Sequence, residues 1–209
     1  MERKEIEKEL ERLPKEWVVA FAVRLSAQCL PALLEKKDTA DPYFSYWPPE
    51  IRSQYLLGVL CLNMLGYVLS TDAAVANICL KAYAYTVHLP SSVAIRTAYF
   101  SSKALSCSLR GAYSSARLFS ARTASDSRVD IVEELSLLKE KQKENEDVAG
   151  YLLLPLWSFE SGWYQYGQKF VEVLRNYGFG FDFWAGWYQD RLEGKGLNME
   201  LIKAVASLS

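Results

Sequence analysis

The sequence predicts an all-α protein, and three observations lead to that fold class. Helix-favouring residues dominate the 209-residue chain. No stretch alternates apolar and polar residues with the period of two that marks a half-buried strand. Short connections separate the helical segments, which favours antiparallel neighbours, so we expect an antiparallel bundle of about eight helices. The bundle would contain one long helix with an Ala/Ser seam and a short aromatic-rich C-terminal helical region.

Start and stop signals set the helices of the first half. Ile6 and Leu10 give the charged first segment an apolar side. Pro14 suits the first turn of a second helix, and Pro31 kinks or ends it. Pro90 ends a later helix that includes His88. We expect helices over residues 2–12, from 14 to near 31, 50–70 and 71–88.

The segment from residue 92 to about 123 predicts one long helix, because it contains no proline and a single glycine, Gly111. Small and apolar residues recur there at spacings of three and four, which is the period of a helix seam. A break near Gly111 is the alternative. The seam would pack within the chain or in a homodimer, and it comprises Ile95, Ala98, Ser102, Leu105, Leu109, Ala112, Ala116 and Phe119.

The last third of the chain predicts four further helices over residues 128–147, 161–177, 182–192 and 198–209. Val132, Leu135 and Leu138 would share the buried face of the first of them. We expect one helical domain over residues 1–209, in which 151–209 forms an aromatic-rich subdomain after a boundary near Gly150.

Composition excludes several protein classes. Lys plus Arg total 24 and Asp plus Glu total 25, which is not the balance of a polycationic nucleic-acid coat. The charged N-terminus has no apolar core of a secretory signal, and the longest apolar run is short for a membrane span. We therefore expect a cytoplasmic protein without a membrane partner. Four widely spaced cysteines predict buried reduced thiols, and they are Cys29, Cys61, Cys79 and Cys107.

No motif for catalysis, a cofactor or a metal is present. A zinc site needs clustered Cys and His, and the chain has one histidine, His88. His88 suits a capping role at its helix end, and the enzyme alternative would combine it with dispersed carboxylates and tyrosines. Glu133 and Glu134 are adjacent acids that we expect on a solvated helix face. The sequence thus predicts a protein that is not an enzyme and uses no cofactor.

A basic stripe is the first candidate binding surface. Four cations recur at intervals of seven, so one continuous helix would place them on a line about 10 Å apart. The stripe would face an acidic protein partner or nucleic acid, or the acid-rich residues 129–150 would neutralise it internally. Its members are Arg96, Lys103, Arg110 and Arg117.

The aromatic C-terminal block is the second candidate. Four of the six tryptophans lie between residues 157 and 187. Aromatics at helical spacing usually form core, whereas aromatics beside an arginine also anchor protein interfaces. The residues proposed for partner binding are Trp184, Trp187, Tyr188 and Arg191.

These residues belong to a signature, W-x2-WY-x2-RL-x-G, that runs from Trp184 to Gly194. Over residues 91–201 the chain resembles a group of bacterial Ala-rich helical proteins that end in this signature. The resemblance implies an all-α protein of bacterial or phage origin and implies no activity.

The function predicted from these features is a non-enzymatic helical interaction module. It would regulate or inhibit a partner protein by covering part of its surface, in the setting of bacteria–phage conflict that the resemblance suggests. The alternative is nucleic-acid binding along the basic stripe, with affinity that falls steeply with salt.

Overall fold

The computed structural model describes residues 1–36, 40, 42–69, 100, 103–105, 107, 112–126, 130–144, 147–178, 180–196, 198 and 200. Every regular element within these residues is helical. This confirms the all-α fold class. The elements are α1 (Arg3–Glu11), α2 (Lys15–Cys29), the 3-10 helix η1 (Leu30–Leu34), α3 (Arg52–Leu69), α6 (Tyr113–Asp126), α7 (Ile131–Lys143), α8 (Val148–Leu152), α9 (Gly162–Tyr177) and α10 (Phe181–Glu193).

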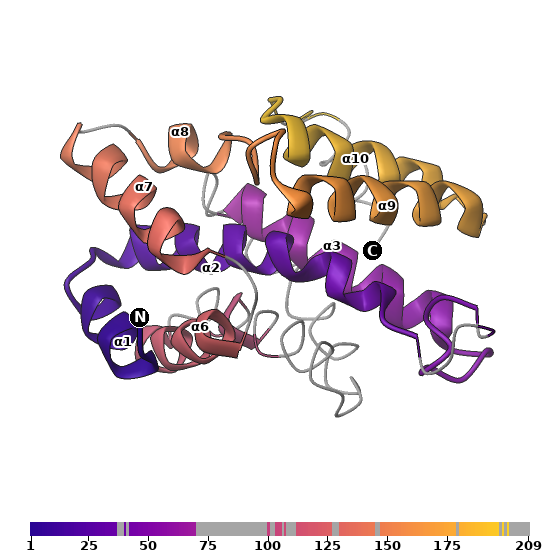
Figure 1. The fold of residues 1–209 in the computed structure, drawn as a ribbon, viewed down its shortest axis with the longest axis horizontal. Coiled ribbons are helices and arrows are strands. Elements are labelled where there is room, and N and C mark those ends of the chain that lie inside the picture. The colour runs from indigo at the N-terminus through magenta and orange to yellow at the C-terminus, as the bar shows by residue number, and fades with distance from the viewer. Residues whose placement is uncertain are drawn as a thin grey trace.

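Helix α2 is the centre of the molecule (Figure 1). α1 and α6 lie along one side of it, α7 and α8 lie along the opposite side, and α9 packs on α10 beyond α3. Every residue from Ala20 to Cys29 is buried, as expected for a helix with almost no polar face. One segment of the described chain, Lys15–Leu34, is long and apolar enough to cross a membrane, and 89% of its most apolar window is buried inside the structure.

The N-terminal helices agree with the sequence predictions. Ile6 and Leu10 of α1 are fully buried. α2 begins directly after Pro14, and Pro31 lies in the first turn of η1, where its missing N–H is tolerated. The predicted helices over 71–88 and 198–209 lie almost wholly outside the described residues.

The prediction of one continuous helix from 92 to 123 is wrong. The rings of Phe100 and Phe119 stack with centroids 6.0 Å apart, whereas 19 residues of straight helix would separate them by about 28 Å. Ala112 lies outside any helix, and its N–H donates to the carbonyl of Cys107 at 2.9 Å. The chain therefore turns back on itself between Phe100 and Phe119. Gly111, where a break was the alternative, lies outside the described residues.

The C-terminal helices end and begin at glycines. Gly180, with a left-handed φ of 80°, caps α10. The helix predicted from residue 182 therefore begins at Phe181, and Asp182 lies in its first turn. Gly194 ends α10 with φ 69°, as a C-terminal αL residue does. In α7, Leu135 and Leu138 are buried as predicted, but Val132 is 50% exposed and does not share their face.

The three cysteines that the structure describes are reduced thiols. Cys29 and Cys107 are buried and Cys61 is half-buried, where burial raises its pKa to about 11. Cys79 lies outside the described residues, as does His88.

Candidate functional site

The four residues of the aromatic block that were proposed for partner binding lie in the core. Trp184, Trp187, Tyr188 and Arg191 are each at most 7% exposed. The Tyr188 hydroxyl donates to the carbonyl of Ala27 at 3.1 Å, and its ring packs edge-on against Phe170. Because a partner cannot reach these side chains, the prediction that they bind one is corrected to the alternative that they form core.

Arg191 has a structural task at the end of α10. Its Nη2 donates to the carbonyls of Lys195 and Gly196, and its guanidinium lies 5.4 Å from the Tyr67 ring centroid. Burial lowers the pKa of Arg191. The arginine of the signature thus holds the chain that leaves α10.

The basic stripe does not form the predicted line. Arg96 and Arg110 lie outside the described residues. Lys103 and Arg117 belong to two segments that lie side by side, because Lys103 Nζ sits 4.8 Å from the ring centroid of Phe119 on α6. Arg117 is half-buried. Seven-residue spacing places cations on a line only along one unbroken helix, and that helix is broken.

A buried ion pair between α2 and α7 is the most specific polar feature of the described chain. Arg24 and Glu134 are 1% and 4% exposed, and Arg24 Nε lies 2.7 Å from Glu134 Oε1. The expectation that Glu134 faces solvent is therefore wrong, although its neighbour Glu133 is exposed. The Tyr151 hydroxyl and the Gln28 amide also donate to Glu134.

These donors fix the charge of Glu134. Its two oxygens accept four hydrogen bonds, two of them from Arg24. Burial alone would raise the pKa of Glu134, but the Arg24 charge and the four donors outweigh it and lower that pKa. The Glu134 carboxylate is ionised, both of its oxygens are hydrogen-bonded, and it is buried away from solvent. Its negative charge compensates the buried positive charge of Arg24.

Arg24 and Gln28 also hold the loop that follows α8. Arg24 Nη1 donates to the carbonyl of Leu154 at 2.7 Å, and Gln28 Nε2 donates to that of Leu156 at 2.9 Å. Arg24 Nη2 reaches the carbonyl of Pro155 at 3.1 Å. Buried charge-assisted bonds of this kind position a loop firmly, so residues 154–156 are fixed relative to α2.

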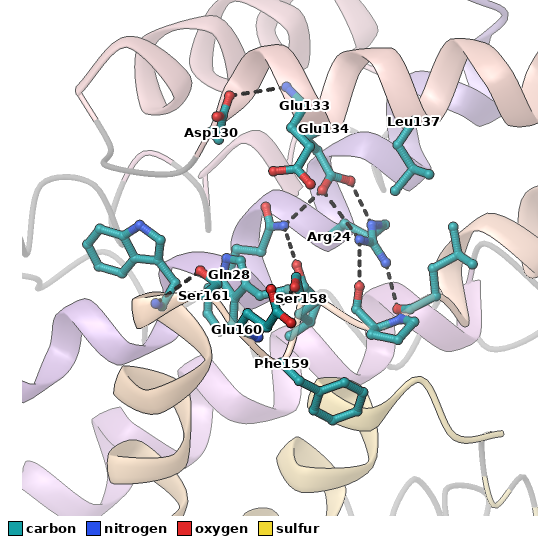
Figure 2. Close-up of a pocket in the computed structure, with 15 residues that line it drawn as sticks. Arg24, Gln28, Asp130, Glu133, Glu134, Leu137, Ser158, Phe159, Glu160 and Ser161 are labelled. Carbon is teal, nitrogen blue, oxygen red and sulfur yellow. Dashed lines mark hydrogen bonds and ion pairs between the residues drawn. The ribbon is translucent and has the colours of Figure 1, made fainter.

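A cavity of about 460 Å³ lies over this cluster, between α2, the start of α7 and residues 154–163. Figure 2 shows Gln28 of α2 and Glu133 of α7 pointing toward one another across it, beside the Arg24–Glu134 pair. The volume is within the range of clefts that bind small molecules or single side chains.

The cavity lining combines acids with aromatic rings. Its charged members beyond the ion pair are all acidic: Asp130, Glu133 and Glu160. Its rings are Trp157, Phe159 and Trp163, and Phe159 is 61% exposed at the rim. Asp130 Oδ1 caps α7 by accepting from two backbone N–H groups, which leaves its second oxygen for other donors.

Sequence reasoning missed this site, although one signal for it was present. Arg24 and Gln28 are one helical turn apart on a helix that from Trp17 onward has only one other polar residue, Ser26. A charged residue in such a helix must be paired when the helix is buried, so it predicts a partner elsewhere in the chain. The identity of that partner, Glu134, could not be read from spacing.

Comparisons of the chain with protein-family models, with curated proteins and with solved structures find no match. The resemblance to bacterial Ala-rich helical proteins therefore stays a prediction. Within the described residues there is no group of three or more His, Cys, Asp or Glu side chains that could hold a metal ion.

Proposed function

We propose that the protein is a non-enzymatic helical interaction module, a regulator or inhibitor of a partner protein, and that the partner binds at the cavity between α2 and α7. The observation that carries this proposal is the cavity itself. Its floor is fixed by the Arg24–Glu134 pair, and an apolar ring, Phe159, stands exposed at its edge. A cavity with a rigid base and an exposed aromatic ring at its rim is suited to bind an anchor side chain of a partner protein.

The state of the buried acid favours binding over catalysis at this place. A general base needs a free lone pair and a pKa near the working pH. Glu134 has neither, since its oxygens are occupied and its pKa is lowered. Tyr151, whose hydroxyl donates to Glu134, has its pKa raised well above the ordinary value by burial and by the Glu134 charge.

The nucleic-acid alternative has lost its geometric basis. It required four cations on one line, and Lys103 instead covers a phenylalanine ring of the neighbouring segment. We therefore place the interaction surface at the cavity and not on the basic stripe.

Selection of displayed random peptides on the folded protein tests the proposal. We expect the selected peptides to lose about tenfold or more in affinity for a Phe159→Ala/Trp163→Ala variant, because both rings line the cavity. The matched control is Leu57→Ala, an exposed apolar residue on α3 that does not line it. Failure to enrich any peptide, or equal affinity for all three proteins, would contradict the proposed function.

A further inference from the structure

We infer that the cavity between α2 and α7 receives an arginine side chain of the partner protein. This inference rests on the proposed function and names the chemistry of the partner. Its basis is a buried acceptor with no donor, an excess of carboxylates and a set of aromatic rings, all facing one cavity.

The orientation of the Gln28 amide is decided by its neighbours. Nε2 lies 2.8 Å from Glu134 Oε2 and 2.9 Å from the Leu156 carbonyl oxygen, and both of these atoms can only accept. The NH₂ group must therefore face them, so the amide oxygen must face the other way. A flipped amide would set an oxygen against a carboxylate.

That oxygen is an unsatisfied acceptor. Gln28 is 5% exposed, and no donor within the described chain reaches its Oε1. A buried polar atom without a partner destabilises the folded state, because it has lost its hydrogen bonds to water. Glu133 points toward Gln28 across the cavity (Figure 2), and two acceptors that face each other can share a donor placed between them.

The charges specify what kind of donor fits. The Arg24 charge is cancelled by Glu134 at 2.7 Å, so it does not oppose a second cation. Asp130, Glu133 and Glu160 then leave the cavity wall negative. A cation with several N–H groups satisfies both the carboxylates and the Gln28 oxygen.

The rings favour guanidinium over ammonium. A guanidinium is planar, stacks on aromatic faces and donates in several directions at once, whereas an ammonium is a compact, strongly hydrated charge. Trp157, Phe159 and Trp163 offer such faces around the cavity.

A second unsatisfied atom favours a peptide over a free organic cation. Trp157 Nε1 is a buried donor that no acceptor within the described residues reaches. A guanidinium has no acceptor to offer it. The backbone carbonyls of an arginyl residue do, so an arginine within a chain offers a donor for Gln28 and also an acceptor for Trp157, a lining residue.

Titration with short peptides tests this inference. The probes are acetyl-Gly-Gly-Xaa-Gly-Gly-amides in which Xaa is arginine, citrulline, lysine or norleucine, together with free agmatine. Binding is followed on the indole N–H signals of Trp157 and Trp163 in ¹H–¹⁵N spectra of the full chain. We expect the arginyl peptide to bind at least about tenfold more tightly than its neutral isostere with citrulline, since charge-assisted bonds are about twice as strong as neutral ones. The lysyl peptide should lie between them.

Charge variants on α7 locate the effect. Glu133→Gln should weaken the arginyl peptide about fivefold, because it removes a lining charge and touches no buried contact. Glu140→Gln removes the same charge from an exposed position of α7 that does not line the cavity, and it should change the affinity less than about twofold.

Several results would overturn the inference. They are equal affinity for arginyl and citrullyl peptides, equal effects of the two variants, or tighter binding of agmatine than of the arginyl peptide. If displayed peptides bind in a Phe159-dependent way but are apolar or acidic, the inference fails and the proposed function stands. If no displayed peptide binds at the cavity, the proposed function itself fails.

Discussion

The Arg24–Glu134 pair shows how one residue can decide the state of several others. Glu134 is the only described acid that contacts the buried Arg24, and its four hydrogen bonds join α2, α7 and α8. Gln28 and Arg24 in turn hold the loop over residues 154–156. The cavity floor therefore depends on a single carboxylate.

Removing the negative charge of Glu134 should lower the stability of the folded protein. Glu134→Gln leaves a buried guanidinium without a counter-ion, and breaking one partner of a buried pair costs about 3–5 kcal/mol. We expect a loss of that size in the free energy of unfolding measured with urea. Glu133→Gln, the exposed neighbour, should stay within about 0.5 kcal/mol of the natural protein. Equal effects of the two changes would show that Glu134 does not carry the pair.

The same pair predicts a pH dependence. The pKa of Glu134 is lowered in the folded protein from its ordinary value of 4.5. A carboxyl group whose pKa is lower in the folded protein stabilises the folded state at a pH above its pKa in the unfolded chain. This stabilisation is lost as the pH falls through its pKa in the folded protein. The difference in unfolding free energy between the natural protein and Glu134→Gln should thus be constant from pH 7 to about 5 and shrink below 4.5. A difference that stays constant down to pH 3 would refute it.

At the scale of elements, the end of α10 is built against the loop that lines the cavity. The N–H of Leu156 donates to the carbonyl of Arg191 at 3.3 Å. A Cβ at Gly194 would lie 2.7 Å from Pro155 Cδ and 2.8 Å from the Leu153 oxygen. Gly194 thus has two reasons to be glycine, its φ of 69° and the close loop.

Substitutions of two glycines, one within α10 and one at its C-terminal end, test whether Gly194 is required for its backbone conformation and its close contact with the loop. Gly194→Ala should destabilise the protein by about 1–3 kcal/mol, through the strained φ and the contact with Pro155. Gly186→Ala, at an exposed position with open space around its Cβ, should stabilise it by about 0.5–1 kcal/mol. Thermal unfolding measures both, and a shift of the same sign for both would contradict the role given to Gly194.

Elements were predictable where the signal is local. Pro14, Pro31, Ser161 and Gly194 act on their own turns, and the helix ends next to them were placed correctly. The long helix was not, because an unbroken three-and-four pattern continues through Gly111 in the sequence while the chain turns back between Phe100 and Phe119. Periodicity reports which face is apolar, and it does not report whether two helices share one pattern.

At the scale of the whole molecule, the cavity is assembled from parts that are distant in sequence. Arg24 and Glu134 are 110 residues apart, and the aromatic rim follows α8. No spacing rule connects such residues, so the sequence could show an isolated arginine in an apolar helix but not its site. The aromatic signature drew attention to α10, which serves instead to hold the loop under the cavity.

The proposed function requires that the protein meets its partner at this cavity. Photo-crosslinking in the cells that encode the protein tests it most directly, with a benzoylphenylalanine placed at Phe159 and, for comparison, at the exposed Leu57 of α3. We predict a discrete crosslinked protein from position 159, joined through an arginine-containing segment, and reduced yield when Glu133→Gln is added. Crosslinking from position 57 alone would contradict binding at the cavity. Crosslinking from position 159 without dependence on Glu133 would contradict only the inference that an arginine enters it.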